Sequence, residues 1–228
     1  MKSGGLHGCS IGRIGPYPLY MESFESLLEN KEVSDEIMDA LFHLFSRKRP
    51  DVLVINNHTL TQILNGTARA RSCYFTKKNI FENKTEVVGP YLEDGNHWTF
   101  FHCSIVDRTV TYLNSLGDTE QRYNKIAENW SKFAASKGYQ GPWQRATRKH
   151  CLQYDSISCG VFTAVFAEAI LEGTKGYLAC SPVQQERERL GWFIFRSLDK
   201  SGICGICHNT VPRKNKASDT NDTFNILN

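Results

Sequence analysis

Residues 153–162 read QYDSISCGVF, and the apolar run that follows predicts a buried helix over 159–171 that begins at a cysteine. Backbone N–H groups at a helix start favour a thiolate, so we expect the pKa of Cys159 to lie below about 8.5. Gly160 allows close approach of a second backbone, and Gln153 adds an uncharged donor that could reach the same point. This arrangement suits a nucleophilic thiol, and the alternative is a buried structural cysteine.

A hairpin is predicted upstream, with strands over 98–106 and 110–113. His97 precedes its first strand and Asn114 follows its second. A thiol nucleophile needs a base, and an amide oxygen can orient an imidazole, so these two residues are candidates for both roles. The alternatives are a surface-loop histidine and an asparagine that ends the strand in a turn.

The register of this hairpin bears on the candidate pair. A turn centred at 107–108 places Asn114 opposite Phe101. Both candidates then lie at one end of the sheet without touching. We therefore expect the loop that carries His97 to fold back.

The order along the chain is a helix, some strands, a hairpin and then helices, which predicts an α+β fold. Further helices are expected over 21–47, 119–138 and 183–198, and short strands over 52–55 and 87–92. Residues 1–20 are predicted to be a flexible N-terminal segment and residues 200–228 a C-terminal tail, leaving a domain over 21–199.

Composition describes an ordinary globular protein. The 228 residues are 40% hydrophobic and 22% charged, with a net charge of +3, which is too small to indicate nucleic-acid binding. No apolar run is long enough for a membrane helix or a signal peptide. We therefore expect an intracellular protein of the nucleus or cytoplasm, without disulfides among its eight cysteines.

The motifs together resemble the ubiquitin-like-protein (SUMO) proteases, a family of papain-like cysteine peptidases. In that family a His-Trp pair begins a strand, an acid or amide follows about seventeen residues later, and a Gln precedes a Cys-Gly-Val-Phe helix start by six. Here His97-Trp98, Asn114, Gln153 and Cys159 fit in order and spacing.

The resemblance implies a papain-like fold, with a central mixed sheet flanked by helices. It implies that Cys159 is the nucleophile, His97 the general base and acid, and Asn114 the residue that orients His97. Gln153 would help to form the oxyanion hole, and Trp98 would pack beside the channel for a Gly-Gly tail. The expected partner is a SUMO-like modifier, the chain is expected to act as a monomer, and no cofactor is expected.

Three departures from the family pattern matter. In the loop before the nucleophile, Asp155-Ser156-Ile157-Ser158 replaces the family's N-G-S-D. Asn114 replaces the usual Asp, and Glu32 stands where the family has a lid tryptophan. One side of the Gly-Gly channel is therefore expected to be open. Two other functions stay open as alternatives: a catalytically weak modifier-binding module, and a viral or transposon-type endopeptidase of the same fold.

Other chemistry-bearing residues compete with this site. Cys204 and Cys207 form a CxxC that could be half of a zinc site or a redox pair, although no second CxxC follows. His102 and His150 are rival bases. We expect His102 to be packed within a strand or to face solvent, and His150 to lie in a solvated basic loop.

Overall fold

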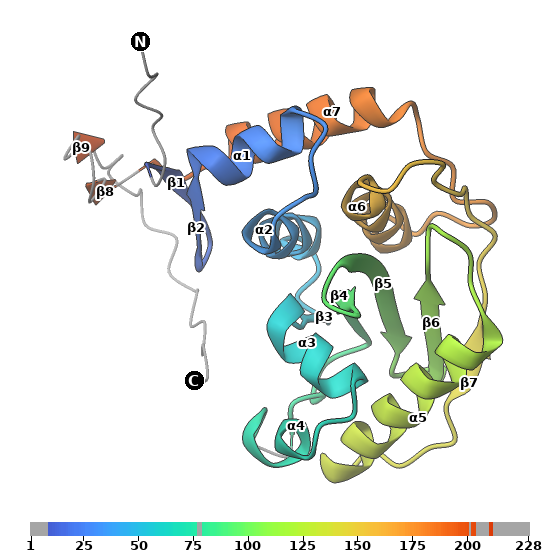
Figure 1. Cartoon of the computed structure of the whole chain (residues 1–228). Coiled ribbons are helices and arrows are strands. Elements are labelled where there is room, and N and C mark those ends of the chain that lie inside the picture. Colours follow the sequence, from blue (N-terminus) through green and yellow to red (C-terminus); the bar gives the residue numbers. More distant parts are fainter. Residues whose placement is uncertain (1–8, 77–78, 201, 204–209, 212–228) are drawn as a thin grey trace.

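The chain folds around a five-stranded sheet with helices on both faces (Figure 1). The computed structural model describes residues 9–76, 79–200, 202–203 and 210–211. The helices are α1 (Met21–Leu28), α2 (Asp35–Ser46), α3 (Asn57–Leu64), α4 (Ala68–Cys73), α5 (Glu120–Ser136), α6 (Cys159–Leu171) and α7 (Val183–Ser197). The strands are β1 (Ser10–Ile14), β2 (Tyr17–Tyr20), β3 (Val52–Val54), β4 (Glu86–Glu93), β5 (His97–Ser104), β6 (Thr109–Leu113), β7 (Gln144–Ala146), β8 (Gly202–Ile203) and β9 (Thr210–Val211).

The central sheet is mixed and has the strand order β3-β4-β5-β6-β7. Strands β4, β5 and β6 form an antiparallel meander. At one edge β3 pairs in parallel with β4, and at the other edge β7 pairs in parallel with β6. The predicted central mixed sheet flanked by helices is therefore confirmed.

Each face of the sheet has its own apolar core, because successive side chains of a strand point to opposite faces. On one face Phe100 of β5 packs against Phe42 of α2, with their ring centroids 6.0 Å apart. On the other face Phe101 packs against Trp130 of α5, with centroids 4.9 Å apart. Helix α6 belongs to the first core and lies beside α2 (Figure 1). The start of α6 is therefore fixed by packing over most of its surface.

Several elements match their predictions closely. Helix α6 covers the predicted residues 159–171, and strands β3 and β4 lie at the predicted positions. Helices α5 and α7 also lie where the periodicity indicated. Within the described residues, none of the helices has the length and apolar character needed to cross a membrane.

The structure differs from the sequence prediction in three places. Residues 10–20 form the β1–β2 hairpin instead of a loop, and Ile14 and Leu19 bury their side chains in the core beside α2. The predicted helix over 21–47 is two helices, because Asn30 takes a left-handed conformation (φ 55°) after α1. Strand β7 has exposed polar residues and pairs through its backbone, so no apolar alternation marked it.

The predicted tail falls largely outside the described residues. Cys204 and Cys207, which form the CxxC motif, both lie outside them, and so does His208. Among the residues that are described, no group of three or more His, Cys, Asp or Glu side chains could hold a metal ion.

Candidate active site

The thiol of Cys159 lies at the first turn of α6, where the helix meets β5. Its residue is only 2% exposed. The backbone N–H of Trp98, at the start of β5, donates to the Cys159 sulfur over 3.5 Å. Because Trp98 directly follows His97, the thiol lies beside the peptide bond that joins these two residues.

Burial raises the pKa of the Cys159 thiol above its ordinary value. The N–H groups of Trp98 and Gly160 act in the opposite direction, and the carboxylate of Glu32 adds to the rise. The sequence prediction of a lowered pKa is therefore wrong. Desolvation of the charged thiolate outweighs the donors at the helix start.

His97 and Asn114 are in direct contact. The ring Nε2 of His97 lies 2.8 Å from the amide Oδ1 of Asn114. His97 is the first residue of β5, and Asn114 directly follows the end of β6. The two residues thus reach each other from adjacent antiparallel strands, across the same end of the sheet.

The expectation that the His97 loop must fold back is wrong. Ser104 pairs with Thr109, so the strands are joined by a longer connection than a turn centred at 107–108 allows. The pairing of Phe100 with Leu113 brings Asn114 two residues closer to His97 than the sequence register predicted. No rearrangement of the loop is needed for contact.

Asn114 is fully buried and is held from several sides. Its backbone N–H donates to Asp118 Oδ1 over 2.8 Å, and its Oδ1 also accepts the Leu116 N–H over 2.8 Å. Its Nδ2 donates to the Tyr112 hydroxyl over 3.2 Å, and that hydroxyl donates to Glu93 Oε2 over 2.7 Å. The side chain of Asn114 therefore has a partner at both ends of its amide.

The sequence analysis missed Glu93. Glu93 is the last residue of β4, and in the antiparallel pairing of β4 with β5 it lies directly opposite His97. Its side chain is buried, and Arg122 of α5 approaches it to 3.3 Å. The available signal was an acidic residue directly after the apolar run 87–92, because a buried charge in such a position needs partners.

Gln153 lies between the Asn114 segment and the loop that leads to Cys159. Its backbone N–H donates to the Ser115 carbonyl over 2.9 Å, and its Oε1 accepts the Ser115 hydroxyl. Its Nε2 donates to the Asp155 carbonyl over 2.8 Å, which leaves the second hydrogen of that nitrogen for another acceptor. Asp155 in turn accepts the N–H of Ser158 over 2.8 Å, next to Cys159.

A fully buried arginine supports the same loop from behind. Arg187 of α7 donates to the carbonyls of Leu27 and Ile157, over 2.9 and 3.5 Å. Its guanidinium thereby connects the end of α1 with the segment that precedes α6. Burial lowers the pKa of Arg187, and the nearby Asp155 opposes that effect.

A narrow wall beside the thiol is formed by Trp98, Val33 and Gly160. The Trp98 indole Nε1 donates to the Val33 carbonyl over 2.8 Å. A Cβ on Gly160 would lie 2.7 Å from Val33 Cβ and 3.1 Å from Trp98 Cδ1. Only glycine fits at this position, because those distances are shorter than van der Waals contact.

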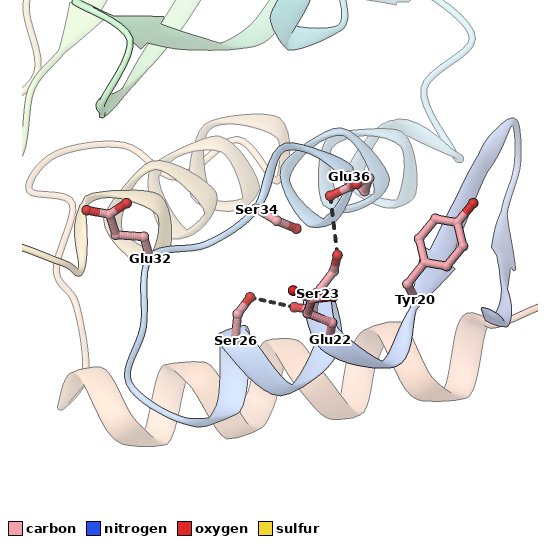
Figure 2. A pocket seen from close by; sticks show the side chains of 7 residues that line it. All are labelled: Tyr20, Glu22, Ser23, Ser26, Glu32, Ser34 and Glu36. Carbon is pink, nitrogen blue, oxygen red and sulfur yellow. Dashed lines mark hydrogen bonds between the residues drawn. The ribbon is translucent and has the colours of Figure 1, made fainter. Parts of the chain in front are cut away.

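An acidic pocket lies between α1 and the segment that leads into α2, and Glu32 is part of its lining (Figure 2). Its volume is about 530 Å³, and its lining includes the carboxylates of Glu22, Glu32 and Glu36 together with three serine hydroxyls. Glu32 is exposed, and its charge acts on Cys159 as described above. The position expected for a lid side chain is thus held by a carboxylate.

The rival histidines have partners away from the thiol. His102 is bonded to Glu86 over 3.0 Å within the sheet, as expected for a packed strand residue. His150 is bonded to Asp118 over 3.1 Å, and its side chain is only 5% exposed. The expected solvated position of His150 is therefore wrong, because its ring packs against Phe166 of α6.

A buried thiol at a helix start, beside a bonded histidine–amide pair at the ends of neighbouring strands, is the arrangement of a papain-like thiol peptidase. A family model described as "Ulp1 protease family, C-terminal catalytic domain" matches residues 33–178, and the chain belongs to that family. No curated protein sequence matches the chain. The family resemblance predicted from the sequence and the assignment as a thiol peptidase are both confirmed.

Solved structures confirm the fold. The chain is similar to the C-terminal Ulp1 protease domain in complex with Smt3, the yeast ortholog of SUMO, at 13% identity and a TM-score of 0.72, over 83% of this chain and 87% of that one. It is also similar to the Ulp1-like SUMO protease catalytic domain of Chaetomium thermophilum, at 19% identity and a TM-score of 0.67, over 82% and 83%. The Xanthomonas campestris effector XopD bound to ubiquitin matches at 16% identity and a TM-score of 0.51, over 71% and 91%.

Proposed function

We propose that this chain cleaves after the Gly-Gly C-terminus of a ubiquitin-like modifier, with a SUMO-type modifier as its substrate. Support comes from its family and from the structures that share its fold. One of these is a Ulp1 domain in complex with the yeast ortholog of SUMO, and another is described as a SUMO protease. We place the peptidase within residues 10–199, because the β1–β2 hairpin packs into the same core, and we propose that it acts as a monomer without a cofactor.

The single observation that carries the proposal is the double contact made by the dipeptide His97-Trp98. Its histidine side chain meets Asn114 at 2.8 Å, and its Trp98 N–H meets the Cys159 sulfur at 3.5 Å. The base thus lies at the end of β5, and the thiol at the start of α6 is bonded to the next residue of that strand. Rigid placement of reacting groups is a large source of rate acceleration.

In the proposed reaction, the Cys159 sulfur attacks the carbonyl carbon of the terminal glycine. His97 takes the thiol proton and gives it to the departing amine as the C–N bond breaks, leaving a thioester on Cys159. His97 then activates water, which adds to the thioester carbon and releases the modifier and the thiol. Asn114 holds the imidazole in position throughout.

The negative oxygen that develops at the attacked carbonyl needs donors. The backbone N–H of Cys159 and the second Nε2 hydrogen of Gln153 serve this role in the proposal. Gln153 is fixed for it by its bonds to Ser115 and Asp155. Its amide orientation follows from these bonds, because Ser115 donates to the oxygen and Asp155 accepts from the nitrogen.

Selection for glycine fits the wall beside the thiol. Trp98, Val33 and Gly160 are packed without room for an added Cβ on Gly160. In the proposal the C-terminal tail of the modifier lies beside this wall, where a residue without a Cβ can approach closely. A substrate that ends in two glycines supplies such residues.

The test uses modifiers that carry a C-terminal electrophile, with SUMO and ubiquitin compared on the full chain. We expect SUMO to label the wild type covalently and Cys159→Ala to remain unlabelled. Cys180→Ser serves as the control thiol variant and should be labelled like the wild type. Labelling that persists in Cys159→Ala, or binding of SUMO without labelling or cleavage, would contradict the proposal. Cleavage of peptides without any folded modifier would favour the endopeptidase alternative instead.

A further inference from the structure

A continuous chain of hydrogen bonds leads from His97 into the protein interior. It runs from His97 to Asn114 (2.8 Å), from Asn114 to Tyr112 (3.2 Å) and from Tyr112 to Glu93 (2.7 Å). Glu93, Tyr112 and Asn114 are 6%, 3% and 0% exposed, respectively. Water therefore has little access to these bonds, and each polar group depends on its protein partner.

We propose that Glu93 is a positioning residue that sets the tautomer of His97 through Tyr112 and Asn114. The proposal rests on the role of His97 given under the proposed function. Glu93 touches neither the thiol nor the expected position of the substrate, and it acts only through the two residues between. Nothing in the family pattern used above includes this residue.

The direction of each bond follows from the number of hydrogens available. An ionised carboxylate only accepts, so the single hydroxyl hydrogen of Tyr112 must point to Glu93. The Tyr112 oxygen then has only lone pairs for Asn114, which must present its NH₂ group there. The amide oxygen of Asn114 consequently faces His97, whose Nε2 must carry the hydrogen.

This direction leaves the other ring nitrogen, Nδ1, unprotonated in neutral His97. An unprotonated Nδ1 is the state in which the ring can take the thiol proton. The Leu116 N–H, which donates to the same Asn114 oxygen over 2.8 Å, favours the same amide orientation. The charge of Glu93 and the Leu116 N–H thus select the same amide orientation, and with it the ring nitrogen that is basic.

Arg122 and burial keep Glu93 and Tyr112 in the required states. The Arg122 guanidinium lies 3.3 Å from the same Glu93 oxygen and compensates its buried negative charge. Burial, and then the hydrogen bond to Glu93, raise the pKa of Tyr112, so the phenol keeps its hydrogen. Both effects maintain a donor at Tyr112 and an acceptor at Glu93.

The same chain explains why an amide at position 114 suits this protein. If residue 114 were Asp, its carboxylate and that of Glu93 would both need the one hydrogen of Tyr112. One carboxylate would lose its bond, and two buried like charges would face each other across the phenol. A negative charge at 93 therefore requires a neutral donor at 114.

The test exchanges these charges. Glu93→Gln and Asn114→Asp are each made alone and together, and Glu86→Gln is the matched control. Glu86 lies at the opposite end of the same strand and, like Glu93, is bonded by an arginine, while its other partner is His102. The first readout is ¹⁵N NMR of the His97 ring in a Cys159→Ala background, assigned by comparison with His97→Gln. The second is kcat and KM for cleavage of a SUMO fusion.

We expect the Cys159→Ala protein without further changes to carry the hydrogen of neutral His97 on Nε2. The same protein with Glu93→Gln should show a mixture of both tautomers. Each single variant should lower kcat by about tenfold with little change in KM. In the double variant Tyr112 donates to the new carboxylate and accepts from the new amide, so the Nε2–H tautomer returns. Its kcat should recover to within about threefold of the wild-type value. Glu86→Gln should leave both readouts unchanged.

Two outcomes would overturn the proposal. One is an unchanged His97 tautomer in Glu93→Gln, and the other is a double variant no better than the worse single variant. The NMR measurement does not depend on turnover. If the proposed function were wrong, the tautomer measurement would still test the role of Glu93. Failure of the proposed function can therefore be distinguished from failure of the Glu93 proposal.

Discussion

The indole Nε1 of Trp98 donates a 2.8 Å hydrogen bond to the carbonyl oxygen of Val33, while the backbone N–H of the same tryptophan points to the Cys159 sulfur. Trp98 therefore ties the segment before α2 to the start of α6. Gly160 lies at the point where these three parts of the chain meet. A change in the spacing of this junction would move the thiol relative to His97.

Replacement of Gly160 by alanine should reduce activity strongly. The added Cβ would lie 2.7 Å from Val33 Cβ, so Val33 and Trp98 must move apart. We expect a loss of about 1–3 kcal/mol in the free energy of unfolding and a fall in kcat of at least about tenfold. Gly191→Ala is the control, since its Cβ would meet only the flexible end of Leu28 at 2.7 Å and should cost little. Equal effects of the two substitutions would contradict the packing argument.

The carboxylate of Glu32 should slow the reaction of the Cys159 thiol with alkylating agents. Its negative charge raises the pKa of Cys159, so Glu32→Gln should lower that pKa and increase the thiolate fraction near neutral pH. We expect a rise of roughly two- to fivefold in the iodoacetamide rate constant near pH 7. Glu25→Gln, which removes an exposed charge from α1, is the control. A rate profile unchanged by Glu32→Gln would show that this charge does not reach the thiol.

His150 should make stability depend on pH. Burial opposes its protonation, but the hydrogen bonds to Asp118 and to the Cys151 carbonyl raise its pKa overall above 6.5. The stabilisation is fully present below the unfolded pKa and is lost as the pH rises through the higher folded pKa. Denaturant unfolding from about pH 6 to about pH 9 should therefore show a decline in stability that is smaller in His150→Gln. Identical pH dependence in the two proteins would refute this role.

The buried guanidinium of Arg187 should contribute to stability and to the geometry of the loop before α6. Arg187→Met removes donors from the Leu27 and Ile157 carbonyls and should lower the free energy of unfolding by about 2 kcal/mol. Arg196→Met, on an exposed position of the same helix, should change it by less than about 0.5 kcal/mol. Both values can be measured by urea denaturation. A smaller effect for Arg187→Met than for the control would mean that the buried bonds add nothing.

Much of this fold could be predicted from the sequence. The apolar run that begins at Cys159 predicted α6 with its observed bounds, and two runs rich in aromatic and β-branched residues around a polar break predicted the β5–β6 hairpin. Such patterns depend on neighbours within a few residues, and so local sequence carries them. Strand β7 escaped prediction because its polar residues pair through backbone groups alone, which every residue type offers.

The sequence by itself determined the order and spacing of His97, Asn114, Gln153 and Cys159, and through them the family of the protein. Only the tertiary structure decided which of these side chains touch. The contact between His97 and Asn114 depends on a strand register that a two-residue shift in the turn would change. The burial of Glu93 and the raised pKa of Cys159 depend on chain segments that are distant in sequence. Desolvation and hydrogen-bond direction are properties of a packed environment, and no local pattern of residues carries them.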